Sequence, residues 1–498
     1  MLRKIRITMA TLSMLCITLL FLDFTGVLHH WLGWLAKVQF VPAILALNFA
    51  VIAILVVLTF IFGRIYCSVI CPLGIMQDIM ARLRFKKKKK HQFTTEKKWL
   101  RYPILILFII AMVCGFGAFW VFLEPYGSFG RIASNLLQPI YLWLNNILAG
   151  IAEHYESYMF YDKEIWIRSL PTFIVAAATF FIISAMAING GRTYCNTICP
   201  VGTVLGFVSR FSLFGIRIDK DKCKQCGACV RKCKSSCIDV KTMTVDYSRC
   251  VVCGNCTGNC KFGALHYGMM NKSSHNADET SGKDNKNDNV DDGRRAFLTG
   301  SVMLATTAAL AQTQKKVDGG LAVIEDKISP VRNTPITPPG SLSARNFQQR
   351  CTACQLCVAE CPNQVLVPGT DLTHFMQPTM SYDKGYCRSE CNRCSQVCPT
   401  GAIRPISQEE KTSIQIGHAV WVKKNCLPAT EGISCGNCAR HCPTGAIQMI
   451  PSDPNDESSP LIPAVNTAVC IGCGACENLC PANPSAIYVE GHEQHREI

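Results

Sequence analysis

The stretch that decides how this chain is interpreted is residues 223–233, which read CKQCGACVRKC. Its cysteines follow the spacing C-x2-C-x2-C-x3-C, which recurs at three further places, and two stretched quartets are related to it. The six quartets are Cys223, Cys226, Cys229 and Cys233; Cys250, Cys253, Cys256 and Cys260; Cys351, Cys354, Cys357 and Cys361; Cys387, Cys391, Cys394 and Cys398; Cys426, Cys435, Cys438 and Cys442; and Cys470, Cys473, Cys476 and Cys480. They take up most of the 31 cysteines, so the chain repeats one cysteine-based unit.

This spacing is typical of bacterial ferredoxins, in which cysteine thiolates hold 4Fe-4S clusters. Three cysteines of a run bind one cluster, and the fourth reaches the neighbouring cluster. We therefore expect the first three cysteines of residues 223–233 to share a cluster with Cys260, and those of residues 250–256 to share one with Cys233. Six quartets predict six clusters and a function in electron transfer. In the first stretched quartet, three residues instead of two separate Cys387 from Cys391. In the second, eight residues separate Cys426 from Cys435, so a loop must bring Cys426 back to its cluster.

Other uses of cysteine fit the pattern less well. A disulfide framework suits small secreted domains and needs no run of three equally spaced cysteines. Zinc ribbons use two separated C-x2-C pairs. The sequence C-x-x-C-H, which attaches c-type haem, does not occur.

Apolar residues make up 49% of the 498 residues and are concentrated in the first 200. Near-continuous apolar runs occupy Ile7–Leu28, Phe40–Phe62, Tyr102–Leu123 and Leu170–Ile188. Each run is close to the roughly 20 residues that cross a bilayer as a helix. We therefore predict a membrane bundle of four spans within residues 1–215.

Lysine and arginine in the short loops set the orientation of such a bundle. Basic residues precede the first run at Arg3, Lys4 and Arg6, and residues 64–101 hold eleven more, including Lys86 to Lys90. Residues 124–169 hold only Arg131, Lys163 and Arg168. Both ends of the bundle are then cytoplasmic, in a bacterial inner membrane. The asymmetry explains much of the net charge of +15, and since no nucleic-acid motif accompanies it, we expect no nucleic-acid partner.

The outer loop of this bundle contains apolar residues at helical spacing between Leu136 and Ile151. We expect this segment to lie along the membrane interface as a lid on the bundle. A simple connector helix is the alternative.

The middle of the chain separates two halves. Residues 271–293 are polar and charged, which predicts a disordered linker. Arg294 and Arg295 follow, then an apolar stretch that ends in small residues at Ala311. Charged start, apolar middle and small-residue end are the parts of a twin-arginine export signal. Residues 294–311 are thus an internal signal, or a fifth span or anchor; an accidental arginine pair before a short helix is the alternative.

A signal in mid-chain indicates that two ancestral proteins were fused near residue 290. Residues 216–270 would then be a cytoplasmic two-cluster ferredoxin. Residues 312–498 would be a ferredoxin with four clusters on the periplasmic side. The expected fold is a membrane α-helical bundle followed by α+β ferredoxin-like 4Fe-4S modules.

A second repeat lies in the membrane half, where GRIYCSVICPLG at residues 63–74 recurs as GRTYCNTICPVG at residues 191–202. Cys67 and Cys71, like Cys195 and Cys199, are four residues apart and share a helical face. Four converging thiols suit an additional iron–sulfur centre or a redox-active dithiol in the membrane. Burial as small apolar side chains is the alternative, which we assume for Cys16 and Cys114.

No catalytic residue can be assigned. Asp23, His29 and His30 at the outer end of the first run, and Gln77 and Asp78 beside the first repeat, are candidate proton acceptors for a quinol. Polar groups are also common at helix ends for structural reasons.

The membrane half, with its doubled GR-x-Y-C-x3-CP-x-G motif and following pair of quartets, resembles the NapH family of membrane quinol dehydrogenases. The C-terminal half resembles NapG, their partner ferredoxin with a twin-arginine signal; the quartets that begin at Cys426 and Cys470 and the sequence CPANPSAI at residues 480–487 match best. A fusion of the two would cover nearly the whole chain. The resemblance implies that the protein oxidises quinol of the membrane pool and delivers electrons to a periplasmic reductase or cytochrome.

Two other functions share these motifs. Membrane polyferredoxins of the CcoG type also contain C-x3-CP, and this resemblance implies a metal-reducing assembly factor for a respiratory oxidase. That family ends in a β-sandwich domain, whereas this chain ends in four further quartets. An outward relay from a cytosolic ferredoxin is the third variant, because cysteines do not reveal the direction of electron flow.

Overall fold

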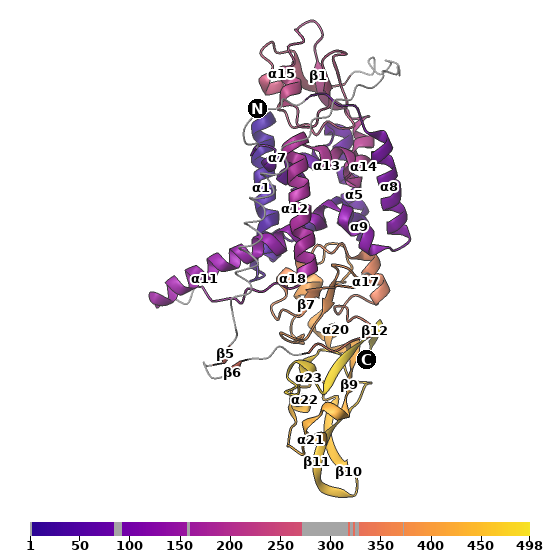
Figure 1. Ribbon diagram of the computed structural model, residues 1–498. Helices are drawn as coiled ribbons and strands as arrows, with labels where there is room; N and C mark the ends of the chain where they lie inside the picture. Colours follow the sequence, from indigo (N-terminus) through magenta and orange to yellow (C-terminus); the bar gives the residue numbers. More distant parts are fainter. Residues whose placement is uncertain are drawn as a thin grey trace, which may run out of the picture.

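A computed structural model describes residues 2–83, 92–156, 160–270, 317–318, 322–323, 328–371 and 373–498. The predicted linker at 271–293, the twin-arginine segment at 294–311 and the lysine run at 86–90 lie outside the described residues. The remainder forms three parts stacked along one axis (Figure 1). A helical bundle lies in the middle, with the first ferredoxin at one end and the C-terminal ferredoxin at the other.

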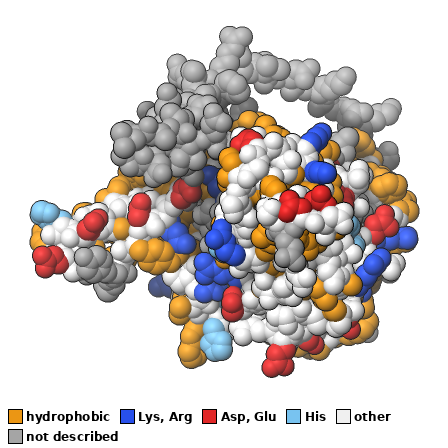
Figure 2. All heavy atoms as spheres, turned by 90° about the horizontal axis from the view of Figure 1, so that it is seen from below, with side chains coloured by type: hydrophobic (Ala, Val, Ile, Leu, Met, Phe, Trp, Pro, Cys, Tyr) orange, Lys and Arg blue, Asp and Glu red, His pale blue; other side chains and the backbone are white. Residues whose placement is uncertain are grey.

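The bundle contains two long helices and a set of shorter ones. Its elements are α1 (Leu2–Leu22), α2 (Val27–Leu32), α3 (Trp34–Lys37), α4 (Phe40–Leu45), α5 (Phe49–Phe62), α6 (Tyr66–Val69), α7 (Pro72–Met80), α8 (Lys98–Val113), α9 (Gly117–Leu123), α10 (Pro125–Ile132), the π-helix η1 (Ala133–Leu137), α11 (Gln138–His154), α12 (Leu170–Gly190), α13 (Thr193–Thr197) and α14 (Pro200–Ser209). The predicted helix in the outer loop corresponds to α11, which projects sideways from the bundle (Figure 1, Figure 2).

Among the described residues, α1 and α12 are long and apolar enough to cross a membrane. The prediction of four continuous spans is wrong for the other two runs, each of which is broken into two helices. Between α4 and α5, Leu47 takes a φ of 53° and the Asn48 side chain accepts from the Val51 amide, which starts a new helix. Between α8 and α9, Gly115 takes a φ of 77°. Apolar composition alone does not reveal these breaks.

The first ferredoxin is built from short strands and cysteine-bearing loops. Its elements are β1 (Phe214–Ile218), α15 (Ala228–Lys232), β2 (Ile238–Asp239), β3 (Thr244–Val245), the 3-10 helix η2 (Thr257–Asn259) and β4 (Leu265–Met269). β1 pairs with β4 and β2 with β3, both antiparallel. Ile216, Ile238 and Leu265 form its small core together with Cys233 and Cys256. The strands therefore hold the two cysteine loops against each other.

The C-terminal ferredoxin repeats this construction. Its elements are β5 (Val317–Asp318), β6 (Ala322–Val323), α17 (Ala344–Arg350), α18 (Leu356–Glu360), β7 (Leu366–Pro368), β8 (Pro378–Met380), α19 (Arg393–Val397), α20 (Gln408–Ser413), β9 (Ile414–Trp421), η4 (Lys423–Asn425), α21 (Leu427–Thr430), α22 (Asn437–Arg440), β10 (Ile447–Asp453), β11 (Asp456–Val465), α23 (Ala475–Asn478) and β12 (Ile487–Glu497). The antiparallel pairs are β5–β6, β7–β8, β9–β12 and β10–β11. One hydrophobic core runs from Phe21 and Trp120 of the bundle to Phe347, Leu356 and Tyr382, which fixes this ferredoxin to the end of the bundle.

Candidate electron-transfer site

Two groups of thiols converge in the first ferredoxin. The cysteines that line its two pockets are Cys223, Cys226, Cys229 and Cys260 in one, and Cys233, Cys237, Cys250, Cys253 and Cys256 in the other. The structure thus brings together the groups that the exchange of the fourth cysteine predicts. The Sγ atoms of Cys233 and Cys237 are 3.6 Å apart. The hydrogen bond from Cys237 lowers the pKa of Cys233 to about 7, so Cys237 belongs to the immediate surroundings of this group.

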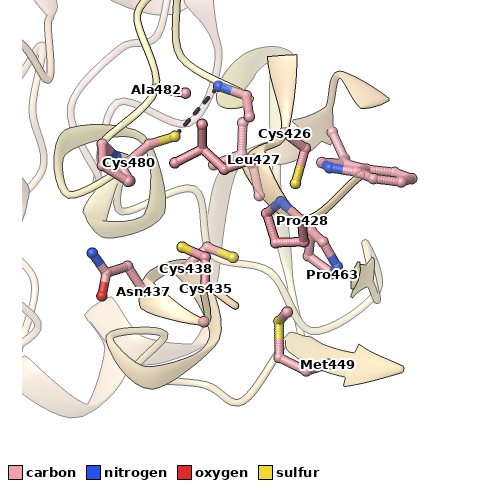
Figure 3. A pocket seen from close by; sticks show the side chains of 15 residues that line it. Cys426, Leu427, Pro428, Cys435, Asn437, Cys438, Met449, Pro463, Cys480 and Ala482 are labelled. Carbon is pink, nitrogen blue, oxygen red and sulfur yellow. Dashed lines mark hydrogen bonds between the residues drawn. The ribbon is translucent and has the colours of Figure 1, made fainter. Parts of the chain in front are cut away.

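The C-terminal ferredoxin shows the same exchange in both of its halves, where the sequence left the pairing open. The groups are Cys351, Cys354, Cys357 and Cys398; Cys361, Cys387, Cys391 and Cys394; Cys442, Cys470, Cys473 and Cys476; and Cys426, Cys435, Cys438 and Cys480. Figure 3 shows the last group around its pocket. The short helix α21 follows Cys426 directly and keeps this distant cysteine beside the other three.

The pockets fit 4Fe-4S clusters. Backbone amides donate to cysteine sulfur, as Ala353 does to Cys351 at 3.4 Å and Ala486 to Cys480 at 3.3 Å. Hydrogen bonds of this kind tune the reduction potential of a cluster. Burial raises the pKa of Cys473 to about 12 and that of Cys438 to about 11. Free thiols would stay protonated there, whereas iron binds them as thiolates and displaces the proton.

The four C-terminal groups lie in a row that leads away from the bundle. The Cys387 amide donates to the Cys473 carbonyl at 2.9 Å, which joins the second group to the third. Cys476 lies close enough to Cys438 for the two thiols to interact electrostatically, so the third group is next to the fourth. In Figure 1, α18, α23 and α21 follow one another along this direction.

The repeated motif places four buried thiols together inside the bundle. Gly63 ends α5 with a φ of 79°, and Gly191 ends α12 with a φ of 70°. After each turn the chain forms a short helix and then a second one that begins with proline. The members of this group, called here the bundle tetrad, are Cys67, Cys71, Cys195 and Cys199, all buried and within electrostatic reach of one another.

The arginines of the motif tie the two copies together reciprocally. Arg64 donates to the Cys195 carbonyl at 3.1 Å, and Arg192 donates to the Cys67 carbonyl at 2.6 Å. The last glycine of each copy leaves room for this contact. A Cβ added at Gly74 would lie 2.7 Å from Arg192 Nη1, and one at Gly202 would lie 2.8 Å from Arg64 Nη2. The motif therefore encodes a contact between its own two copies.

Buried positive charge surrounds the bundle tetrad. Asp78 contacts Arg6, Arg192 and Lys234. Arg64 is fully buried and has no carboxylate partner among the described residues; its side chain donates to Asn196, to carbonyls and, at 3.8 Å, to the Cys67 sulfur. An uncompensated buried charge is strongly unfavourable. A centre of negative charge at the four sulfurs would balance it.

Several of the basic residues from which the membrane orientation was predicted make contacts inside the protein instead. Arg6, Arg64 and Arg101 are buried rather than placed at lipid headgroups. Arg101 pairs with Glu96 at 2.7 Å and donates to the Ser248 carbonyl. Counting charges along a loop does not distinguish these side chains from exposed ones.

The bundle tetrad lies between the two ferredoxins. On one side, the Arg192 amide donates to the Lys234 carbonyl at 2.9 Å and Arg64 donates to the Ser248 carbonyl at 2.9 Å; the first acceptor is next to Cys233 in the sequence, and the second is two residues from Cys250. On the other side, Arg131 donates to the Ala353 carbonyl at 3.4 Å.

Two buried tyrosines belong to the hydrophobic core that contains the bundle tetrad and extends into both ferredoxins. Tyr194 lies within electrostatic reach of Cys195 and Cys199, and Tyr126 lies within reach of Cys354. Both tyrosines also interact with Glu124. The protein interior is thus continuous from one ferredoxin to the other.

The candidate proton acceptors have different surroundings. The Asp23 carboxylate accepts from the amides of Thr25, Gly26 and Leu28 and so fixes the chain at the start of α2. Gln77 donates to the Cys195 sulfur at 3.2 Å. His29 faces Glu360 of the C-terminal ferredoxin, a contact between residues more than three hundred positions apart that no local sequence signal announces.

Comparison with known proteins agrees with this chemistry. Residues 44–90 and 170–219 match the family described as "4Fe-4S binding domain", and residues 350–402 and 433–483 match the "4Fe-4S dicluster domain". The first two matches contain the two copies of the repeated motif. No solved structure shows a significant match to the chain.

Several of the curated relatives carry ferredoxin-type names. The methylamine utilization ferredoxin-type protein MauM of Methylobacillus flagellatus is 32% identical over 34% of this chain and 74% of its own length. MauM of Paracoccus denitrificans is 32% identical over 39% of this chain and 91% of its own length. The putative electron transport protein YccM of Escherichia coli is 21% identical over 39% of this chain and 48% of its own length. The chain belongs to the family of ferredoxin-type 4Fe-4S electron-transfer proteins that includes MauM.

Proposed function

We propose that this protein is a membrane quinol dehydrogenase of the fused NapH–NapG kind, which takes electrons from quinol and delivers them to a periplasmic reductase or cytochrome. The six exchanged cysteine groups hold six 4Fe-4S clusters, and the bundle tetrad holds a seventh iron–sulfur centre. When bound, these centres accept and release single electrons. The polypeptide supplies the thiolates, the amide donors to sulfur and the apolar surroundings that exclude water.

The observation that carries this proposal is the position of the bundle tetrad. It lies between two ferredoxins at opposite ends of a bundle, and the backbone beside cluster ligands contacts the bundle at both ends. The unpaired charge of Arg64 supports an anionic centre at this place. A simple structural role for the four thiols would leave that buried charge uncompensated.

The outer surface of the bundle supports its placement in a membrane. Apart from α1 and α12, the broken helices carry exposed apolar side chains, among them Ile54 and Val57 on α5 and Ile106 and Ile110 on α8. Interrupted helices are tolerated at membrane depth where protein covers their backbone. On α11, which projects sideways, Trp143, Leu144 and other apolar residues are exposed, as in a helix that lies in the membrane interface.

Because the ferredoxins lie at opposite ends of the bundle, they should lie on opposite sides of the membrane. A reporter fused after Ile498 should be active in the periplasm, and one fused near Asn271 should be active in the cytoplasm. Cell fractionation with the two reporters tests this. If both report the cytoplasm, the chain cannot deliver electrons to a periplasmic acceptor.

Quinol oxidation has a direct test. The anaerobically purified chain, mixed with a reduced menaquinol analogue, should show paramagnetic signals of reduced 4Fe-4S clusters within the first turnover. The matched control is the same chain mixed with the oxidised quinone. If no quinol reduces the clusters, while a reduced ferredoxin does, electrons enter from the cytosol instead. If neither donor acts, a metal-reducing assembly factor becomes the better explanation.

A further inference from the structure

Three metal-ligating side chains meet where the bundle joins the C-terminal ferredoxin. Asp23 follows α1, His29 lies on α2 and Glu360 ends α18. A ligand atom of each lies within 4.8 Å of the others. None of them belongs to a cysteine group, and the contacts that link the bundle tetrad to the two ferredoxins do not involve them.

The histidine and the glutamate are buried without hydrogen-bond partners. Their side chains are 8% and 2% exposed, and His29 Nδ1 is 3.6 Å from Glu360 Oε2. Both ring nitrogens of His29 and Oε2 of Glu360 have no hydrogen-bond partner among the described residues. Burial lowers the pKa of His29 to about 4. Buried polar atoms without partners are rare and require an explanation.

The surrounding backbone holds these side chains in place. The Asp23 carboxylate accepts four hydrogen bonds at the start of α2, three at Oδ1 and one, from the Leu28 amide, at Oδ2, which leaves one lone pair of Oδ2 free. Gly26 has a φ of 82°, and a Cβ at this position would lie 2.5 Å from Glu360 Oε1. Arg393 Nη1 approaches the same oxygen at 3.6 Å and is partly exposed. Oε2 of Glu360 is thereby directed towards His29 rather than towards solvent.

We propose that Asp23, His29 and Glu360 bind one divalent transition-metal cation that joins the bundle to the C-terminal ferredoxin. Two carboxylates balance its double charge, and a neutral imidazole completes three ligands. Imidazole with carboxylates suits zinc, iron and manganese. The cation takes one unpartnered ring nitrogen of His29, the unpartnered Oε2 of Glu360 and one oxygen of Asp23, and it links residues of the two halves of the chain.

Manganese tests the site because it prefers oxygen and nitrogen ligands and leaves thiolate clusters intact. The full chain, treated with a chelator, should bind one Mn²⁺, seen as loss of the signal of free Mn²⁺ in paramagnetic resonance. Bound Mn²⁺ should show hyperfine coupling to a histidine nitrogen. His29→Gln should lose this coupling and bind at least about tenfold more weakly, the scale of lost metal-site contacts. His30→Gln, beside it but exposed, should bind as the unaltered chain does.

Iron content, measured in each variant, shows whether the protein is folded. If Glu360→Gln disturbs the adjacent Cys361, His29→Gln alone decides the outcome. The proposal is overturned if the unaltered chain takes up no Mn²⁺, or if His29→Gln retains both the affinity and the nitrogen coupling. In the latter case the cation binds elsewhere as an adventitious ion only.

Discussion

Replacing Cys67 and Cys195 together by serine should stop electron transfer between the two ends of the protein. Serine oxygen is a poor substitute for thiolate on iron, and each repeat loses one ligand. The unaltered chain should contain about 28 irons, four for each of seven centres, and the double variant about four fewer. Electron flow is measured in vesicles that enclose ferricyanide, with reduced ferredoxin added outside on the side of the first ferredoxin. Flow should fall to the level of vesicles without protein.

The control for this experiment is Cys114→Ser, because Cys114 belongs to no cysteine group and, contrary to the expectation that it is buried, is exposed. It should keep both iron and electron flow. A double variant that retains the full iron content and still transfers electrons would show that the bundle tetrad has a structural role. Retention of the other irons shows that the double variant is folded, so a loss of flow can be assigned to the tetrad.

Removal of Cys361 should eliminate the centre held by Cys387, Cys391 and Cys394. The centre held by the other three cysteines of its own quartet should remain. The test is whether the iron lost in a double variant equals the sum of the losses in the two single variants. Cys361→Ser and Cys394→Ser should each lose about four irons, and the two together should still lose about four. Cys361→Ser combined with Cys357→Ser should lose about eight, because these neighbours in sequence serve different clusters. The opposite pattern of losses would show that each quartet binds its own cluster.

The C-terminal pair is the better place for this experiment than the first ferredoxin. In the first ferredoxin, the Sγ atom of Cys237 lies 3.6 Å from that of Cys233, so Cys237 could replace Cys233 as a ligand. The other cysteines beside Cys351, Cys354 and Cys357 are Cys398 and, next to Cys357, Cys394, and both belong to a cysteine group already.

The cysteine groups were predictable because the ferredoxin spacing is a local property of the sequence. Even the exchange of the fourth cysteine follows from the length of the run. That prediction was made for the first ferredoxin, whereas the pairing in the C-terminal half, including the partners of the distant Cys426, required the structure. The thiols of the bundle were also predictable as a set, because the motif occurs twice in the same frame.

The remaining features depend on contacts between distant segments. The breaks at Leu47 and Gly115 lie inside apolar runs whose composition favours uninterrupted helices. Arg64 appears as one basic residue among eleven, and only the fold shows that it crosses to the other copy of its motif. Glu360 is hidden between two cysteine ligands, so its approach to His29 cannot be read from its surroundings in the sequence.

The reciprocal contact of Arg64 and Arg192 has a consequence for biogenesis. Half of the bundle tetrad, with Cys67 and Cys71, emerges from the ribosome well before the other half, since all of α8 to α12 is translated in between. Until then Arg64 lacks the Cys195 carbonyl that receives it in the mature fold. If the bundle tetrad binds iron as proposed, the iron is inserted only after the later helices have been placed beside the earlier ones, and loading of this centre then reports completion of the bundle.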